Sequence, residues 1–242
     1  GPLHGVPVGV KDIFDTSDYP TECGSPLYAG RRTLEDAAAV ARLREAGLVI
    51  LGKTVTAEFA GLSPGPTTNP HDSQRTPGGS SSGSAAAVAA YMTPLALGTQ
   101  TNGSVIRPAS YCGVVGYKPT YGLVSRHRTL TTSRNLDQVG VFARTLEDVA
   151  LMAEAMIGFD ARDEDACLRP HPSLAPKCHE EPPMPPRLAF VKGPAWAQCE
   201  TSTREAFGEL VEALGDHVEE VEIDTVYDEV FAWHRIVMEA DI

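Results

Sequence analysis

The sequence predicts an α/β fold, because helix-like and strand-like apolar segments alternate along most of the chain. Three segments have the helical spacing of apolar residues, and each begins with Ser or Thr three residues before an acidic residue: 33–47, 145–158 and 202–215. Short apolar segments are predicted to be strands, at 6–13, 48–52, 93–97, 188–191 and 218–223. The last two strands bracket the third helix, which is the order of a βαβ unit.

The length of the chain suits one large domain. A chain of 242 residues with 42% hydrophobic residues can bury a substantial core, and we interpret residues 1–242 as a single incomplete domain. The first residues enter directly at a turn and strand, and residues 226–242 resemble an unfinished helix, so both ends are expected to be cuts through a larger protein. Residues 160–187 are rich in proline and charge, which predicts a linker or surface loop; a proline-rich ligand for a partner is the alternative.

The overall charge bears on the partners of the chain. A net charge of −12 argues against a nucleic-acid partner, because phosphate binding needs clustered Lys and Arg. No signal peptide or 18-residue apolar span is recognisable, which argues against a membrane role. The five cysteines are odd in number and lack metal-binding spacing, so we expect reduced thiols, no metal and a cytoplasmic protein. For the oligomeric state, we consider a homodimer.

Two glycine- and serine-rich turns carry the candidate chemistry. The first turn contains Ser80 and runs into a helix of small residues at 85–90, and the second contains Ser104 and follows a predicted strand. A serine hydroxyl needs a base to become a nucleophile, and the histidines lie mostly in polar or proline-rich segments. Lys11 is the better candidate base, because an apolar strand would remove water from its ammonium and lower its pKa. Ser80 could then pass a proton between Lys11 and Ser104.

The turn before Ser104 also suits the binding of an oxyanion. Backbone N–H groups of Thr101, Asn102 and Gly103 can converge on one point, and such donors commonly stabilise a developing negative charge by about 3 kcal/mol each. Other interpretations stay open, because glycine-rich loops are often flexible connections or helix caps. A loop of this kind before a helix can also bind phosphate, although no nucleotide-binding pattern is present.

Taken together, these segments resemble the amidase signature family. Residues 78–90 and 95–120 are similar to the family signature, residues 5–12 to its lysine motif, and the resemblance covers residues 1–158 well. It implies an α/β/α sandwich on a mixed central sheet, truncated here at both ends. It also implies a Ser–cisSer–Lys triad that needs no cofactor.

Roles follow from the resemblance by motif position. It implies that Ser104 is the nucleophile, that Ser80 is the serine after a cis Gly79–Ser80 peptide bond, and that Lys11 is the base. Ser81 would supply a supporting hydrogen bond. The reaction implied is acyl transfer, in which Ser104 attacks an amide, ammonia or an amine leaves, and water hydrolyses the acyl-enzyme.

The segment from Gln100 to Arg107 indicates a branch within the family. Gln100 together with an arginine three residues after Ser104 resembles the branch that contains bacterial malonamidase. Arg107 is therefore a candidate to bind a substrate carboxylate, with a structural role in the loop as the alternative. We expect an amidohydrolase that acts on a small amide. If Arg107 binds a substrate carboxylate, that amide also carries a free acid. The alternatives are the amidase subunit of a tRNA-dependent amidotransferase and a non-catalytic fragment or scaffold.

Overall fold

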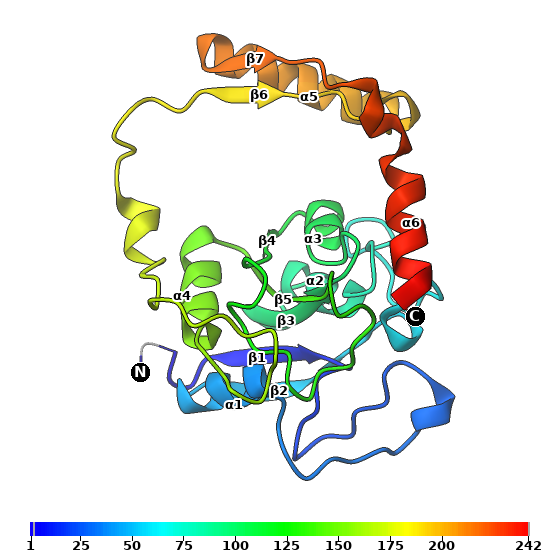
Figure 1. The fold of residues 1–242 in the computed structure, drawn as a ribbon, viewed down its shortest axis with the longest axis vertical. Coiled ribbons are helices and arrows are strands. Elements are labelled where there is room, and N and C mark those ends of the chain that lie inside the picture. Colours follow the sequence, from blue (N-terminus) through cyan, green and yellow to red (C-terminus); the bar gives the residue numbers. More distant parts are fainter. Residues whose placement is uncertain (2, 242) are drawn as a thin grey trace. The chain divides into compact units, whose positions relative to one another are not determined.

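The computed structural model describes residue 1 and residues 3–241, and its contacts divide the chain into two compact units (Figure 1). Unit 1 is Gly1–His179 and unit 2 is Glu180–Ile242. Pro2 and Ile242, which belong to the two chain ends considered above, lie outside the described residues.

Unit 1 is built on a five-stranded mixed sheet. Its strands are β1 (Pro7–Lys11), β2 (Val49–Thr54), β3 (Leu95–Gln100), β4 (Val115–Tyr117) and β5 (Gln138–Ala143), in the spatial order β2-β1-β3-β5-β4. Strand β1 runs parallel to β2 and β3, whereas β5 runs antiparallel to β3 and β4. The predicted α/β fold with a mixed central sheet is therefore confirmed.

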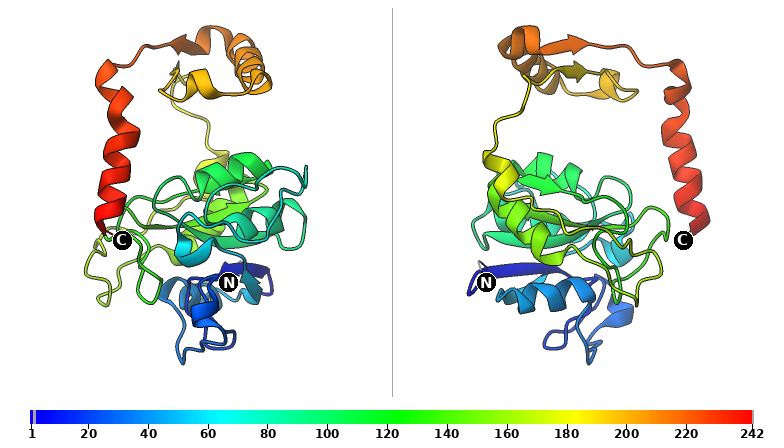
Figure 2. Two further views of the ribbon diagram at one scale, coloured as in Figure 1. Left: turned by 90° about the vertical axis from the view of Figure 1, so that its right-hand side faces the viewer. Right: turned by 60° about the vertical axis from the view of Figure 1, so that its left-hand side comes forward.

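Helices cover both faces of this sheet. Helices α1 (Ala38–Glu45) and α4 (Leu146–Met156) pack on one face, and α2 (Ser82–Ala89) and α3 (Ile106–Cys112) pack on the other (Figures 1 and 2). The side chains of β3 alternate accordingly, because Leu95 and Leu97 join the first core and Ala96 joins the second. Unit 1 also contains the 3-10 helices η1 (Pro26–Tyr28), η2 (Glu58–Ala60) and η3 (Pro176–His179).

The helix starts only partly follow the sequence pattern. At α4 the prediction is confirmed, because the Thr145 hydroxyl accepts a hydrogen bond of 3.1 Å from the Asp148 N–H. At α1 it is wrong, because the helix begins at Ala38 and the N-cap position is held by Ala37 rather than by Thr33. The Asp36 carboxylate instead accepts from the Ser17 N–H at 2.8 Å and pairs with Arg44 at 2.8 Å.

Residues 160–187 span the division between the two units. Within unit 1 this segment is held by hydrogen bonds from the Cys167 N–H to the Gly122 carbonyl (2.8 Å) and from the Ala175 N–H to Glu154 (3.1 Å). The last residues of the segment, from Glu180, belong to unit 2. Its role as a linker, and the interpretation of residues 1–242 as one domain, stay predictions.

Unit 2 contains the predicted βαβ arrangement. It consists of β6 (Leu188–Phe190), η4 (Trp196–Gln198), α5 (Thr201–Leu214), η5 (Gly215–His217), β7 (Val218–Glu220), η6 (Thr225–Glu229) and α6 (Val230–Asp241). Strands β6 and β7 pair in parallel on either side of α5 in the sequence. Helix α5 begins before Ser202, so the predicted cap at that serine is wrong, whereas its predicted end at Gly215 is confirmed by a φ of 51°.

Gly98 allows the close contact on which the α2 face of the sheet depends. A Cβ at this position would lie 2.7 Å from the Phe142 ring and 2.8 Å from the Ser81 hydroxyl. We expect Gly98→Ala to lower the free energy of unfolding, measured by urea denaturation, by about 1–3 kcal/mol, because the added methyl group overpacks a buried layer.

The matched control for this prediction is Gly52→Ala in β2. A Cβ on Gly52 would meet no atom within 4 Å, so the expected change is within about 0.5 kcal/mol. Equal losses of stability in the two variants would contradict this account of Gly98.

Candidate active site

Lys11 is the most unusual side chain of unit 1, because its ammonium is fully buried at the end of β1. Nζ donates hydrogen bonds of 2.7 Å to Ser80 Oγ and 2.8 Å to Thr99 Oγ1. Burial lowers the pKa of Lys11 to about 7, and the negative charge of Asp137 acts in the opposite direction. The lysine can therefore hold or release a proton near neutral pH.

Ser80 lies in the loop that leads into α2, and its neighbour ties that loop to the sheet. The Ser81 hydroxyl donates to the Thr99 carbonyl at 3.0 Å and accepts from the Thr99 N–H at 3.2 Å. Ser81 thus bonds to both backbone groups of the residue whose side chain contacts Lys11. This arrangement fixes the position of Ser80 relative to the end of β3.

Ser104 is 7% exposed and lies beside Ser80. Its Oγ accepts a hydrogen bond of 3.1 Å from the Ser80 backbone N–H. Among the hydrogen bonds of residues 1 and 3–241, none joins Ser104 Oγ directly to Lys11 or to Ser80 Oγ. The three predicted triad residues are therefore adjacent, and Ser80 is the one that contacts both of the others.

The prediction of a cis Gly79–Ser80 peptide bond is wrong. Every peptide bond among the described residues is trans, the isomer that is favoured by about 3–4 kcal/mol for a residue other than proline. In this trans arrangement the backbone of Ser80, rather than its hydroxyl, contacts Ser104.

The turn between β3 and Ser104 is anchored at both ends. The Thr101 hydroxyl donates a short hydrogen bond to the Asp137 carboxylate. Gln100 Oε1 accepts from the N–H groups of Val105 (2.9 Å) and Ile106 (3.0 Å), so it caps the start of α3.

The backbone of this turn reverses at Gly103, whose φ is 80°, a conformation that favours glycine. None of the turn and loop hydrogen bonds between described backbone groups uses the N–H of Thr101, Asn102 or Gly103. An oxyanion hole at these residues stays a prediction.

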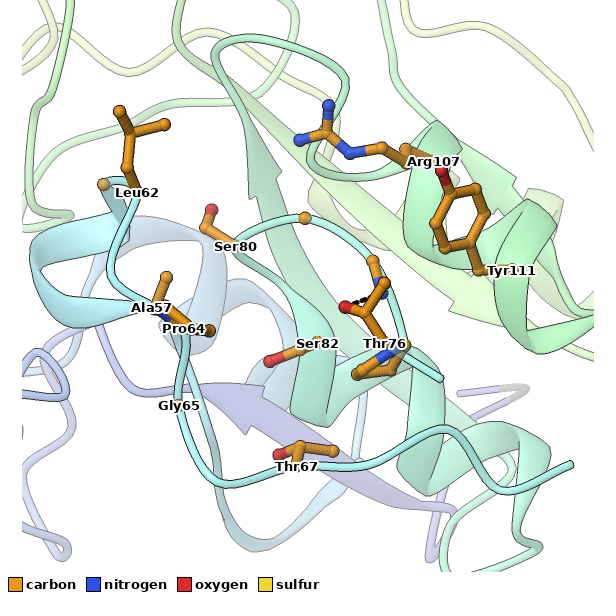
Figure 3. A pocket seen from close by; sticks show the side chains of 14 residues that line it. Ala57, Leu62, Pro64, Gly65, Thr67, Thr76, Ser80, Ser82, Arg107 and Tyr111 are labelled. Carbon is orange, nitrogen blue, oxygen red and sulfur yellow. Dashed lines mark hydrogen bonds between the residues drawn. The ribbon is translucent and has the colours of Figure 1, made fainter. Parts of the chain in front are cut away.

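A cavity of about 340 Å³ opens beside Ser80 (Figure 3). Figure 3 shows Ser80 between Leu62 and Arg107, which lie on opposite sides of the opening. Of the described residues that line the cavity, Arg107 is the only charged one, and it is exposed. A Cβ on Gly79 would meet the Arg107 guanidinium at 2.5 Å, so the absence of a side chain there lets the guanidinium lie against the Ser80 loop. Ser104 does not line this cavity.

Sequence reasoning missed two residues of the site. Thr99 lies on β3, before the serine turn, and accepts a hydrogen bond from Lys11. Asp137 lies just before β5 and accepts a hydrogen bond from the Thr101 hydroxyl. Asp137 lies within residues 1–158, which resemble the family, but no role was assigned to it from the sequence. Only the pairing of β3 with β5 indicates what that aspartate contacts.

Other kinds of site find little support in the part of the chain that the structure describes. No group of three or more His, Cys, Asp and Glu residues there could hold a metal ion. No helix among the same residues is both long and apolar enough to span a bilayer. All five cysteines are free thiols. Location in the cytoplasm and assembly as a homodimer stay predictions.

A buried lysine bonded to one serine and lying beside a second is the arrangement expected of serine hydrolases that work without histidine. Comparison with known families identifies the chain further: a family model described as Amidase matches residues 1–240, so the chain belongs to the amidase family.

Relatives and solved structures agree with this assignment. The chain is 42% identical to the A subunit of glutamyl-tRNA(Gln) amidotransferase from Thermobifida fusca, over 98% of this chain and 49% of that protein. The corresponding protein of Thermotoga maritima has a TM-score of 0.89 and 38% identity, covering 100% of this chain and 55% of that one. Peptide amidase of Stenotrophomonas maltophilia has a TM-score of 0.83 and 31% identity, covering 100% and 52%. The chain therefore spans about half the length of the relatives that it matches.

The exclusion of a nucleic-acid partner is wrong. Several relatives are named as one subunit of an amidotransferase that acts on glutamyl-tRNA(Gln), so members of this family take part in reactions on RNA. The net charge was a poor basis for that prediction, because it is a sum over the whole chain. It limits how many phosphate contacts the chain can make, but not which complex the chain can join.

The pKa of Lys11 has a measurable consequence for stability. Because its folded-state pKa of about 7 lies below the ordinary value of 10.5, the unfolded chain binds more protons between these two pH values. The free energy of unfolding should therefore rise with pH across this window, by up to about 1.4 kcal/mol per pH unit from this group. Lys11→Met removes the amine and should lose that part of the slope in urea denaturation measured from pH 7 to 10.

The matched control is Lys192→Met, which removes an exposed ammonium paired with Glu220. This variant should keep the slope of the wild-type protein. A Lys11→Met protein whose stability changes with pH as the wild type does would show that Lys11 is not a neutral amine in the folded state.

Proposed function

We propose that the protein is an amidohydrolase that cleaves a small carboxamide through an acyl-enzyme on Ser104. The observation that carries this proposal is the buried Lys11 ammonium, which is bonded to Ser80 and thereby placed beside Ser104. A lysine whose pKa lies near 7 can accept a proton at physiological pH, which an exposed lysine cannot do. Membership of the amidase family supports the same reaction.

In this proposal the proton moves away from the nucleophile as the new bond forms. Ser104 Oγ attacks the amide carbonyl carbon, its proton passes through the Ser80 hydroxyl, and neutral Lys11 becomes an ammonium. The carbonyl oxygen becomes an oxyanion, which the N–H groups of the turn at 101–103 would stabilise. The C–N bond then breaks, the leaving nitrogen takes a proton back from Lys11, and water hydrolyses the ester on Ser104 by the same route.

Arg107 is the residue from which we infer the class of substrate. Its guanidinium is exposed beside the cavity, and among the described residues it makes no hydrogen bond or ion pair. The rest of the lining includes hydroxyl groups of Thr67, Thr76 and Tyr111 and no carboxylate. A planar guanidinium binds a carboxylate through two parallel hydrogen bonds, so a short amide that carries a free acid fits best. This substrate class is the one indicated by the resemblance to malonamidase, which stays a prediction.

A second function is favoured by the names of the relatives. In an amidotransferase of that kind, the same site would release ammonia from an amide donor for use by an enzyme that acts on glutamyl-tRNA(Gln). The two functions differ in what they require. An amidohydrolase releases ammonia from small amides without any partner, whereas a subunit of an amidotransferase would do so as part of the assembled enzyme. A non-catalytic scaffold would release none under either condition.

The covalent step can be tested with a fluorophosphonate probe, which reacts with activated serines. We expect the probe to label Ser104, and Ser104→Ala to lose both labelling and ammonia release while it keeps its fold by circular dichroism. Ser110→Ala removes an exposed serine from α3 and should label as the wild type does. Undiminished labelling of Ser104→Ala would contradict the assignment of the nucleophile.

The role of Arg107 can be tested with pairs of amides that differ only in a free carboxylate. Arg107→Lys keeps the charge but loses the planar fork, so kcat/KM should fall about tenfold or more for the acidic amides and much less for the neutral ones. Arg32→Lys, an exposed arginine outside the cavity, is the control and should change neither. Equal losses on both kinds of amide would make Arg107 a structural residue.

A further inference from the structure

Asp137 and Thr101 face each other just beyond the paired ends of the antiparallel strands β3 and β5. The register of β3 and β5 pairs Gln100 with Gln138, so the next position of the ladder sets Thr101 opposite Asp137. Their side chains form the short hydrogen bond described above. Asp137, the residue just before β5, therefore contacts the turn that leads to Ser104.

The Asp137 carboxylate is surrounded by hydrogen-bond donors. One oxygen accepts from the Thr101 hydroxyl, and the other accepts from the N–H groups of Thr132 (2.6 Å) and Ser133 (3.0 Å). The residue is only 7% exposed. A buried carboxyl group with three donors and no acceptor around it suits the anion, because a carboxylate can only accept.

The negative charge of Asp137 is not matched by an ion pair among the described residues. Arg126 lines the same small cavity of about 10 Å³, together with Thr99 and Asp137. Its guanidinium contacts the Asp137 backbone carbonyl at 3.3 Å, but its ion pairs are with Asp165 (2.6 Å) and Asp163 (3.8 Å). The charge of Asp137 is therefore free to act on the buried lysine.

Lys11 has no carboxylate partner of its own among the described residues. Its two hydrogen-bond partners are the neutral hydroxyls of Ser80 and Thr99. Asp137 is the charged group that opposes the effect of burial on the lysine pKa. Thr99 lies next to both, since it contacts Lys11 and lines the cavity that Asp137 lines.

We propose that Asp137 is a positioning residue that acts on both the turn at 101–103 and the lysine. Its carboxylate accepts a hydrogen bond from Thr101, and its charge stabilises the protonated form of Lys11. The proposal rests on the proposed function, in which Lys11 accepts the proton of Ser104 and the turn binds the oxyanion. Positive charge on the lysine and negative charge on the substrate oxygen arise in the same step. The Asp137 carboxylate favours the positive charge on the lysine through space. Through its hydrogen bond to Thr101 it also orients the N–H groups that bind the oxyanion.

The test measures the rate of fluorophosphonate labelling of Ser104 as a function of pH, which needs no knowledge of the natural amide. Asp137→Asn removes the charge, and Asp137→Ser is the second uncharged variant in case the first does not fold. Thr101→Val removes the hydroxyl that Asp137 holds but keeps the charge. Asp15→Asn is the matched control, because Asp15 is also 7% exposed but pairs with Arg31 and Arg128.

In the wild type, labelling should fall as pH drops through about 7, because the Lys11 amine becomes protonated. Removal of the Asp137 charge lowers the pKa of Lys11 further, so this midpoint should move down by about one pH unit in both Asp137 variants. Thr101→Val should keep the midpoint and lower the plateau rate about tenfold, because the turn loses its hydrogen bond to Asp137. Asp15→Asn should change neither quantity.

An unchanged midpoint in a folded Asp137 variant, with a normal profile in the wild type, would overturn the role of Asp137 and leave the proposed function standing. An unchanged plateau rate of labelling in Thr101→Val would also overturn the role of Asp137, because its hydrogen bond to Thr101 would then not hold the turn. A wild-type protein that is not labelled at Ser104 at any pH would contradict the proposed function, and this inference with it.

Discussion

A buried ammonium at the end of β1 is the constraint on which the rest of the site depends. Removing the charge of Lys11 from water is unfavourable, and its hydrogen-bond partners are two neutral hydroxyls, so the free amine is favoured near neutral pH. The surrounding structure maintains that burial. Ser81 binds both backbone groups of Thr99, and Gly98 leaves room for it, so the start of α2 closes over the end of β3.

This constraint explains how a serine could react without a histidine. Histidine suits general-base catalysis because its ordinary pKa is near neutrality, whereas lysine reaches that range only when it is desolvated. In unit 1 the desolvation comes from the sheet itself, and Asp137 keeps the pKa of Lys11 from falling further. The proposed mechanism therefore uses the core of the fold as part of the catalytic machinery, and Arg107 contributes only at the cavity beside it.

Much of this arrangement could be predicted from sequence, and the rest depends on contacts between distant segments. The motifs identified the family, and the family resemblance implied that Lys11, Ser80 and Ser104 act together; the structure places them side by side. The role of Asp137 needed the register of two antiparallel strands, which a local pattern does not contain. The start of α1 was mispredicted for a similar reason, since Asp36 binds Ser17, a residue far from the helix in sequence. The trans peptide before Ser80 differs from the family expectation.

The most direct test of the central claim is the titration of Lys11 itself. Carbon-13 NMR of protein labelled at the lysine ε-carbon, with the signal assigned by its loss in Lys11→Arg, follows the protonation of this one amine. The account predicts a midpoint near pH 7, so that the amine is mostly neutral at pH 8. A midpoint near 10.5, the ordinary pKa of lysine, would contradict it, because a permanently charged Lys11 could not accept the proton of Ser104.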